Sequence, residues 1–196
     1  MPLFVPELNL THGQALWALN RGRAPDRTMI DQLRHLRRLG VPFEEGEGQG
    51  HGNRVRYDFD HLVATGVAIF ALRNRMPPRE LAQMFVSGRS QLRSACRKAW
   101  KELPENALLQ DWLKSRGKAG AVRGDEIYLR LHDRYSDKSG QFDFLRPSDL
   151  ADLVKTGIIV ERFDDDQFRP VLALKNFMLE LIHWALQAPD IKPGPK

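Results

Sequence analysis

Residues 26–57 constrain the fold strongly, because three segments of different character follow one another there. Residues 28–38 repeat apolar side chains at helical spacing and carry several arginines, which predicts a basic amphipathic helix. Residues 44–52 contain four glycines in nine positions, which no helix or strand interior tolerates, so a flexible loop is expected. Residues 53–57 alternate arginine with apolar side chains, which is typical of a short strand.

The helix has two distinct faces. Its apolar stripe consists of Met29, Ile30, Leu33 and Leu36. The opposite face consists of Arg27, Thr28, Asp31, Arg34, His35 and Arg38. A cap at Asp26 or Thr28 is expected to begin the helix, and Gly40 is expected to end it.

This pattern favours a surface that reads DNA. A helix in the major groove must offer guanidinium, amide, imidazole or hydroxyl groups to base edges while its other face is buried. A neighbouring strand can then place arginines, here Arg54 and Arg56, along the phosphate backbone or in the minor groove. The alternative interpretation is a solvated helix that is basic by chance.

The charge distribution supports an anionic partner for this part of the chain. The net charge is +5, and residues 21–101 carry 16 Lys and Arg against eight Asp and Glu. Residues 102–196 carry 14 against 16, so the basic excess coincides with the predicted DNA-reading segment. The alternative is that the basic surface only keeps the protein in solution.

The length of 196 residues allows one large or two small domains. The single cysteine, Cys96, excludes an intrachain disulfide and a cysteine-based zinc cluster, and it is expected to be a partly buried helix residue. We see neither a signal peptide nor an apolar run long enough for a membrane span. A cytoplasmic, nucleoid-associated protein without membrane contact is therefore expected.

Further helices are predicted on both sides of this stretch. Residues 11–20 form a short helix capped by Thr11, and residues 21–25 form the turn into the basic helix. An apolar helix starts at Asp58 or Asp60 and closes at Arg75. After Pro77-Pro78, the pattern predicts a short helix, Arg79 to Phe85, and then a separate basic helix over residues 87–103.

These parts, in this order, resemble the MerR-type winged helix-turn-helix over roughly residues 10–86. The residues that carry the resemblance are Leu39-Gly40-Val41-Pro42, Arg54-Val55-Arg56-Tyr57 and Met76-Pro77-Pro78-Arg79-Glu80-Leu81-Ala82. The resemblance implies sequence-specific binding of double-stranded DNA, as a homodimer, at a promoter or operator. By position it places Arg27, Thr28, Asp31, Gln32, Arg34, His35 and Arg38 at the groove, and Arg54, Arg56 and Tyr57 at the backbone.

The sequence departs from that family in two respects. The expected long dimerisation helix is replaced by about four turns before Pro104, and the paired cysteines of the metal sensors are absent. Neither metal sensing nor the usual coiled-coil dimer is therefore expected.

The second half has a different composition and predicts a small α+β domain. The expected division is a DNA-binding region over 1–114, a linker over 115–124, a dimerisation or effector domain over 125–188 and a disordered tail over 189–196. Before the linker, a helix is predicted at 105–114; after it, strands are predicted at 126–132, 141–145, 157–163 and 168–174, and helices at 150–156 and 175–187.

The last of these helices is apolar over more of its surface than one buried stripe needs. The residues concerned are Phe177, Met178, Leu181, Ile182, Trp184 and Ala185. The excess is suited to a two-fold partner, so this helix is predicted to form the homodimer. The alternative is a helix buried centrally in its own domain.

No constellation of residues supports catalysis, a metal site or a cofactor. The acidic run at 164–166 lacks the pattern of a calcium loop, and the glycines at 46–52 are not followed by the Gly-Lys-Ser/Thr of a P-loop. A transcriptional regulator is therefore predicted, with an unknown effector left open. One alternative is an excisionase-like or replication-initiation DNA-binding protein. Another is an RNA-acting enzyme or toxin, although the sequence has no paired His, Glu or Asp at catalytic spacing.

Overall fold

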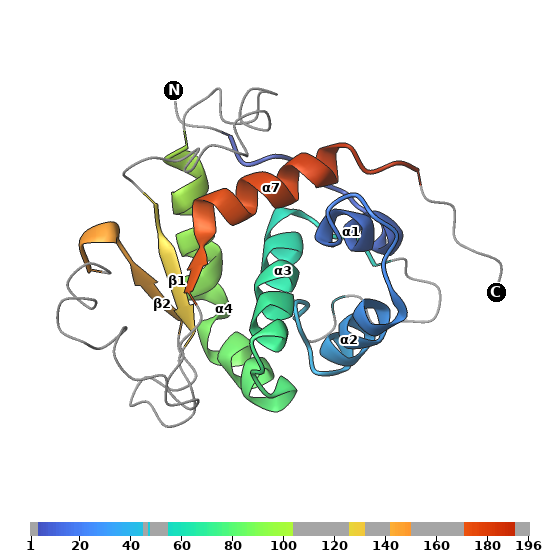
Figure 1. The fold of residues 1–196 in the computed structure, drawn as a ribbon, viewed down its shortest axis with the longest axis horizontal. Coiled ribbons are helices and arrows are strands. Elements are labelled where there is room, and N and C mark those ends of the chain that lie inside the picture. The colour runs from blue at the N-terminus through green and yellow to red at the C-terminus, as the bar shows by residue number, and fades with distance from the viewer. Residues whose placement is uncertain are drawn as a thin grey trace.

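The computed structural model describes residues 4–44, 47, 55–103, 126–131, 142–149 and 171–190. These residues form a mostly helical structure with one three-stranded antiparallel sheet, which confirms the predicted α+β class. Figure 1 shows α3 in the middle, with α1 and α2 on one side and α4 and the strands on the other. Within the described ranges, no helix has both the length and the apolar character needed to cross a membrane.

The first three helices begin where capping side chains satisfy free backbone amides. They are α1 (His12–Leu19), α2 (Arg27–Arg38) and α3 (Phe59–Arg73). Their caps are Thr11, Asp26 and Asp58, each of which accepts a hydrogen bond from the backbone amide three residues later. The predicted helices in this part of the chain are thus confirmed.

The fourth helix, α4 (Pro78–Lys101), is continuous over 24 residues. The prediction of two helices, Arg79 to Phe85 and residues 87–103, is therefore wrong. Gly88 lies inside α4, and a β-carbon there would come within 2.7 Å of the Phe142 ring. This glycine makes room for a close neighbour and does not end a helix.

The sheet is formed by β1 (Tyr128–Leu131), β2 (Phe142–Leu145) and β3 (Val171–Ala173), in the order β2-β1-β3. The strands predicted at 126–132 and 141–145 are confirmed in their described parts, and β1 and β2 pair antiparallel with Leu129 opposite Phe144. An ion pair between Arg130 and Asp143 crosses the two strands. The last predicted strand is shorter than expected, since Leu174 already belongs to a helix.

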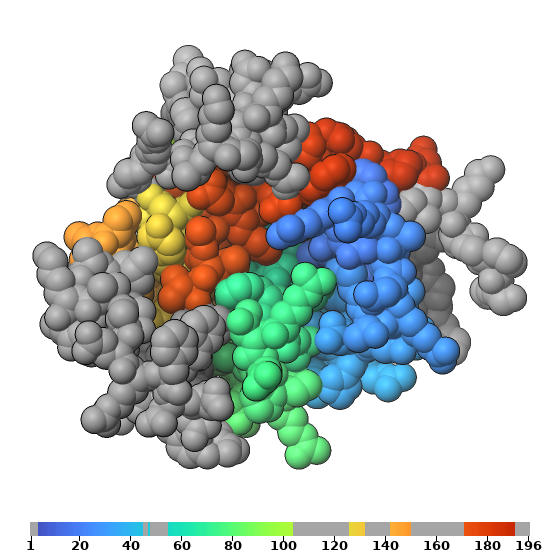
Figure 2. All heavy atoms as spheres, in the orientation of Figure 1, coloured from blue at the N-terminus to red at the C-terminus, as the bar shows by residue number. Residues whose placement is uncertain are grey.

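That helix, α7 (Leu174–Leu186), packs against α1, α3 and α4 of its own chain. Met178, Leu181 and Ile182 are at most 4% exposed. Phe177 fits against Gly66, and Trp184 fits against Gly22. The six residues predicted to form a dimer surface are thus buried or half-buried within the chain, so the exposed apolar excess on which that prediction relied is not present. In Figure 2, α7 (orange to red) lies between the N-terminal segment (blue) and β1 (yellow).

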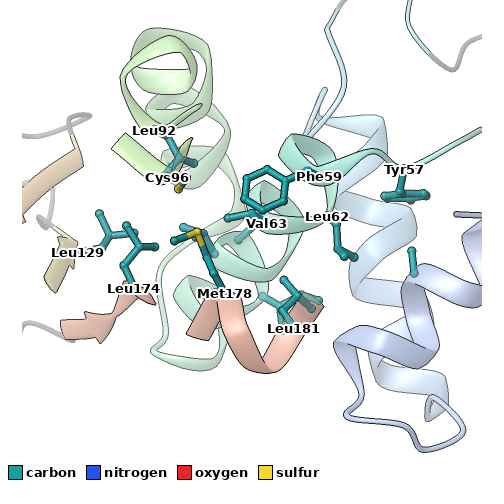
Figure 3. Close-up of a cluster of buried hydrophobic side chains, with 14 of the residues drawn as sticks. Tyr57, Phe59, Leu62, Val63, Leu92, Cys96, Leu129, Leu174, Met178 and Leu181 are labelled. Carbon is teal, nitrogen blue, oxygen red and sulfur yellow. The ribbon is translucent and has the colours of Figure 1, made fainter. Parts of the chain in front are cut away.

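One hydrophobic core joins the two halves of the described chain. Figure 3 shows Met178 of α7 and Leu129 of β1 in the same cluster as Val63 of α3. Glu102, at the end of α4, also binds Lys175 of α7 at 2.9 Å and Arg146 at 3.1 Å. Described residues of the expected second domain thus share one core with residues of the expected first domain.

Several predicted segments lie outside the described residues. They are the helices at 105–114 and 150–156, the linker at 115–124, the strand at 157–163, the acidic run at 164–166, the tail from 191 and most of the loop at 44–52.

Candidate nucleic-acid interface

Helix α2 is held firmly by one face. Met29, Leu33 and Leu36 are between 0 and 3% exposed in the core. Asp26 accepts a hydrogen bond of 2.7 Å from the Met29 amide at the start of the helix. Gly40, with φ of 78°, provides the left-handed turn that follows its end. The helix is therefore anchored at both ends and along one side, and its other side faces solvent.

The solvent-facing side carries the polar residues predicted from the sequence. The exposed members are Arg27, Thr28, Asp31, Arg34, His35 and Arg38, and Gln32 is partly buried. Asp31 lies 2.9 Å from Arg34 and 3.9 Å from Arg27. These pairs are exposed and weak, so they orient the guanidinium groups without removing them from solvent.

Arg37 is a further cation of α2 that sequence reasoning did not include in the site. Its guanidinium carbon lies 5.9 Å from the centre of the Phe43 ring. Burial is the main cause that lowers the pKa of His12, and the positive charges of Arg37 and Arg34 lower it further. Arg37, directly before Arg38 in the sequence, was not assigned to the predicted polar face, although it borders the groove described below.

The arginine-bearing segment after α2 is only partly as expected. Arg54 lies outside the described residues. Arg56 is exposed, and its Nη1 donates a hydrogen bond of 3.4 Å to the Asn9 carbonyl oxygen. Arg56 therefore remains a candidate for phosphate contact.

Tyr57 does not lie on the surface, which corrects its predicted place at the DNA backbone. It is 0% exposed and pairs with Leu10 through two backbone hydrogen bonds of 2.9 and 3.0 Å. Its hydroxyl lies 3.1 Å from Nδ1 of His12. Burial raises the pKa of Tyr57 to about 12, against the lowering effect of Arg37. Tyr57 thus fixes the segment to the N-terminal arm.

A groove of about 1010 Å³ lies between the C-terminal half of α2 and the middle of α4. Its cationic lining comes from both helices and consists of Arg34, Arg37, Arg38, Arg89 and Arg93. Ser87 and Ser90 add hydroxyl groups from α4, and Glu44 and Glu47 add two carboxylates. We call this the arginine groove.

The two glutamates form a turn that is held by side chains of α3 and α4. The Glu44 carboxylate lies 3.5 Å from Arg93 and 3.9 Å from Arg89. Glu47 lies 3.2 Å from Nε2 of His61. Burial works against the charge on His61, but its hydrogen bonds to Asp58 and Glu47 and their negative charges outweigh burial and raise its pKa.

A second set of ion pairs lies behind the groove. Asp60 of α3 accepts hydrogen bonds of 3.0 and 2.6 Å from Arg97, and it also lies 3.4 Å from Nε of Arg93. Arg89 donates a hydrogen bond of 2.8 Å to the Gly40 carbonyl oxygen. These contacts fix α4 against α3 and against the end of α2, so the two walls of the groove are held together.

The described residues contain no group of three or more His, Cys, Asp or Glu side chains that could hold a metal ion. Cys96 lies in α4 as predicted but is fully buried, where partial burial was expected. Burial raises the pKa of its thiol, and the negative charge of Asp60 raises it further. The chemistry of the site is therefore that of fixed cations and hydrogen-bond donors.

No protein-family model, curated protein or solved structure matches this chain significantly.

Proposed function

We propose that this chain binds duplex DNA and that the exposed face of α2 contacts base edges in the major groove. One observation carries the proposal: α2 is anchored through Met29, Leu33 and Leu36, while its arginines, its histidine and a threonine face solvent together. A recognition helix needs this division between a buried and a polar face.

The side chains on that face have the chemistry required for reading bases. Arg27, Arg34 and Arg38 can each donate two hydrogen bonds to guanine, and His35 and Thr28 offer single polar contacts. Asp31 can accept a hydrogen bond from the amino group of cytosine. Arg56 supplies a charge for the phosphate backbone beside the helix.

The order of elements supports a winged helix-turn-helix of the MerR type. Two short helices joined by a turn, α1 and α2, precede an arginine-bearing segment and then α3. With this arrangement, the proposed role is regulation of transcription at a promoter or operator. Dimer formation through α7 is not part of the proposal, because its apolar residues are covered within the chain.

The coverage of α7 favours a second candidate, an excisionase-like or replication-initiation DNA-binding protein. Such a protein organises DNA and does not require two-fold pairing through that helix. Sedimentation of the protein with and without its selected duplex separates the candidates: two copies per palindromic site favour the regulator, and one copy per site favours the second candidate.

The test of DNA reading begins with selection of a preferred duplex from a random pool. We expect Arg27→Ala and His35→Ala each to weaken binding to the selected duplex by about 1–3 kcal/mol, with a smaller effect on unselected duplexes. Lys101→Ala removes one charge at the far end of α4 and should leave the preference unchanged. Absence of any preferred duplex, or full preference in both α2 variants, would refute the proposal.

A further inference from the structure

We propose that the arginine groove binds the phosphodiester backbone of the DNA strand that runs beside α2, and that the carboxylate of Glu44 occupies part of this site until DNA displaces it. This inference rests on the proposed function and extends it to α4. It assigns a binding role to Arg89, Arg93 and Ser90.

The position of the groove argues for the same DNA that α2 contacts. Arg34 and Arg38 are exposed on the DNA-facing side of α2 and also line the groove. A DNA strand that continues past the exposed face of α2 therefore reaches the arginines of α4 along a continuous positively charged surface. Arg89 and Arg93 are four residues apart on α4 and so project from the same face of that helix.

The composition of the groove is that of a backbone site. Its five arginines exceed its two glutamates by three charges. Guanidinium groups bind phosphate oxygens in the same bidentate way as carboxylates, and hydroxyl groups such as that of Ser90 are common phosphate contacts. At about 1010 Å³, the groove lies at the upper limit for small-molecule pockets, which favours a polymer over a small anion.

Glu44 shows how an anion sits in this groove. Its Oε1 lies 3.5 Å from Arg93 and 3.9 Å from Arg89. The Glu44 side chain is 53% exposed, so its ion pairs are weak and a phosphate can replace it at little cost. DNA binding therefore exchanges an internal carboxylate for a backbone phosphate at the same guanidinium groups.

The test compares two added charges on one exposed stretch of α4. Ser90→Glu places a carboxylate in the groove, whereas Gln91→Glu adds the same charge at a neighbouring exposed residue that does not line it. In fluorescence anisotropy with a 20-base-pair random duplex, we expect Ser90→Glu to weaken binding about tenfold and to reduce the salt dependence by about one unit of slope. Gln91→Glu should change affinity by less than about twofold.

A second variant changes affinity in the opposite direction. Glu44→Gln removes the competing charge and should tighten binding to the duplex by roughly threefold, in the range of one surface ion pair. An unfolded variant cannot bind DNA more tightly. A gain of affinity in Glu44→Gln therefore supports the groove assignment independently of whether Ser90→Glu folds correctly. Equal affinities for Ser90→Glu and Gln91→Glu, or no gain for Glu44→Gln, would overturn the groove assignment.

The outcomes also separate this inference from the proposed function. If the α2 variants lose their preference for the selected duplex while the groove variants bind DNA as the unmodified protein does, only the groove assignment is refuted. Failure of the unmodified protein to bind any duplex refutes both. A third outcome would overturn the DNA assignment of the groove. In it, inorganic triphosphate binds saturably and Ser90→Glu weakens that binding, whereas Ser90→Glu leaves the affinity for DNA unchanged. The ligand of the groove would then be a small anion and not the DNA backbone.

Discussion

Trp184 lies directly against Gly22: a β-carbon on this glycine would come within 2.4 Å of Cζ3 and 2.6 Å of Cε3 of the indole. The edge of the Trp184 ring also meets Trp17, with ring centres 5.6 Å apart and planes at 78°. This contact joins the C-terminal helix to the turn between α1 and α2. Through this contact, part of the apolar surface of α7 packs within the chain.

Gly22→Ala is therefore expected to destabilise the fold by about 3 kcal/mol, since a left-handed backbone costs about 1–2 kcal/mol and overpacking costs about as much again. Gly40→Ala is the matched control, because Gly40 has a similar φ of 78° but a β-carbon there would lie 3.9 Å from the Phe43 carbonyl oxygen, an ordinary contact distance. The control should lose only the backbone contribution. Urea unfolding measures both values, and equal losses would show that the indole yields to the added methyl group.

Glu126 is expected to stabilise the start of α7 from a distant part of the chain. Its carboxylate is buried and accepts hydrogen bonds from the amides of Ile127, Lys175 and Asn176 and from the Asn176 side chain. Glu126→Ala should cost about 2–4 kcal/mol, since several buried donors lose their acceptor. Glu126→Gln keeps one acceptor oxygen and should cost less; an equal loss in thermal or urea unfolding would contradict this account.

The two histidines near α2 should titrate on opposite sides of the ordinary value of 6.5. Burial and the arginines of α2 lower the pKa of His12, so its contribution to stability is lost as pH falls below 6.5. Asp58 and Glu47 raise the pKa of His61 despite burial, so its contribution is complete below 6.5 and is lost as pH rises through its higher folded pKa.

Imidazole NMR titration checks this pair directly. Glu47→Gln should lower the pKa of His61, because it removes a negative charge beside the imidazole, and should leave His12 almost unchanged. The prediction fails if His12 titrates above His61 in the unmodified protein.

Arg56→Ala is expected to weaken binding to all duplexes alike and to reduce the salt dependence by about one unit of slope, as for one lost phosphate contact. The reason is its exposed position in the segment between α2 and α3, where its bond to the Asn9 carbonyl oxygen is long at 3.4 Å. A salt titration by gel shift compares it with Lys101→Ala. An unchanged slope, or an effect confined to the selected duplex, would exclude a backbone role.

Local signals allowed much of the fold to be predicted from the sequence. Thr11, Asp26 and Asp58 cap helices where the sequence placed them, and the stripe of α2 is buried as expected. Each of these features depends on neighbours within about four residues. The strands β1 and β2 followed from the residue pattern of 126–132 and 141–145, which is also local.

The wrong predictions concern contacts between distant residues. Residues 79–85 and 87–103 were predicted as separate helices, but α4 is continuous there. Phe142 fills the space beside Gly88, and no local pattern reveals that ring. Tyr57 was placed at DNA by resemblance, although its alternation with Arg56 already put it on the opposite side of the strand. Arg89 and Arg93 reach the arginine groove because α4 continues without a break.

The dependence of α1 and α3 on α7 has a consequence for the order of synthesis. A ribosome makes residues 12–101 long before residues 174–186, so the surfaces that receive Phe177 and Trp184 wait uncovered while the rest of the chain is translated. Premature termination anywhere before Leu174 would leave Gly22 and Gly66 facing water, a fragment prone to association and degradation. The amino-terminal helices, although they carry the proposed DNA-reading surface, acquire their final stability only after α7 has been made.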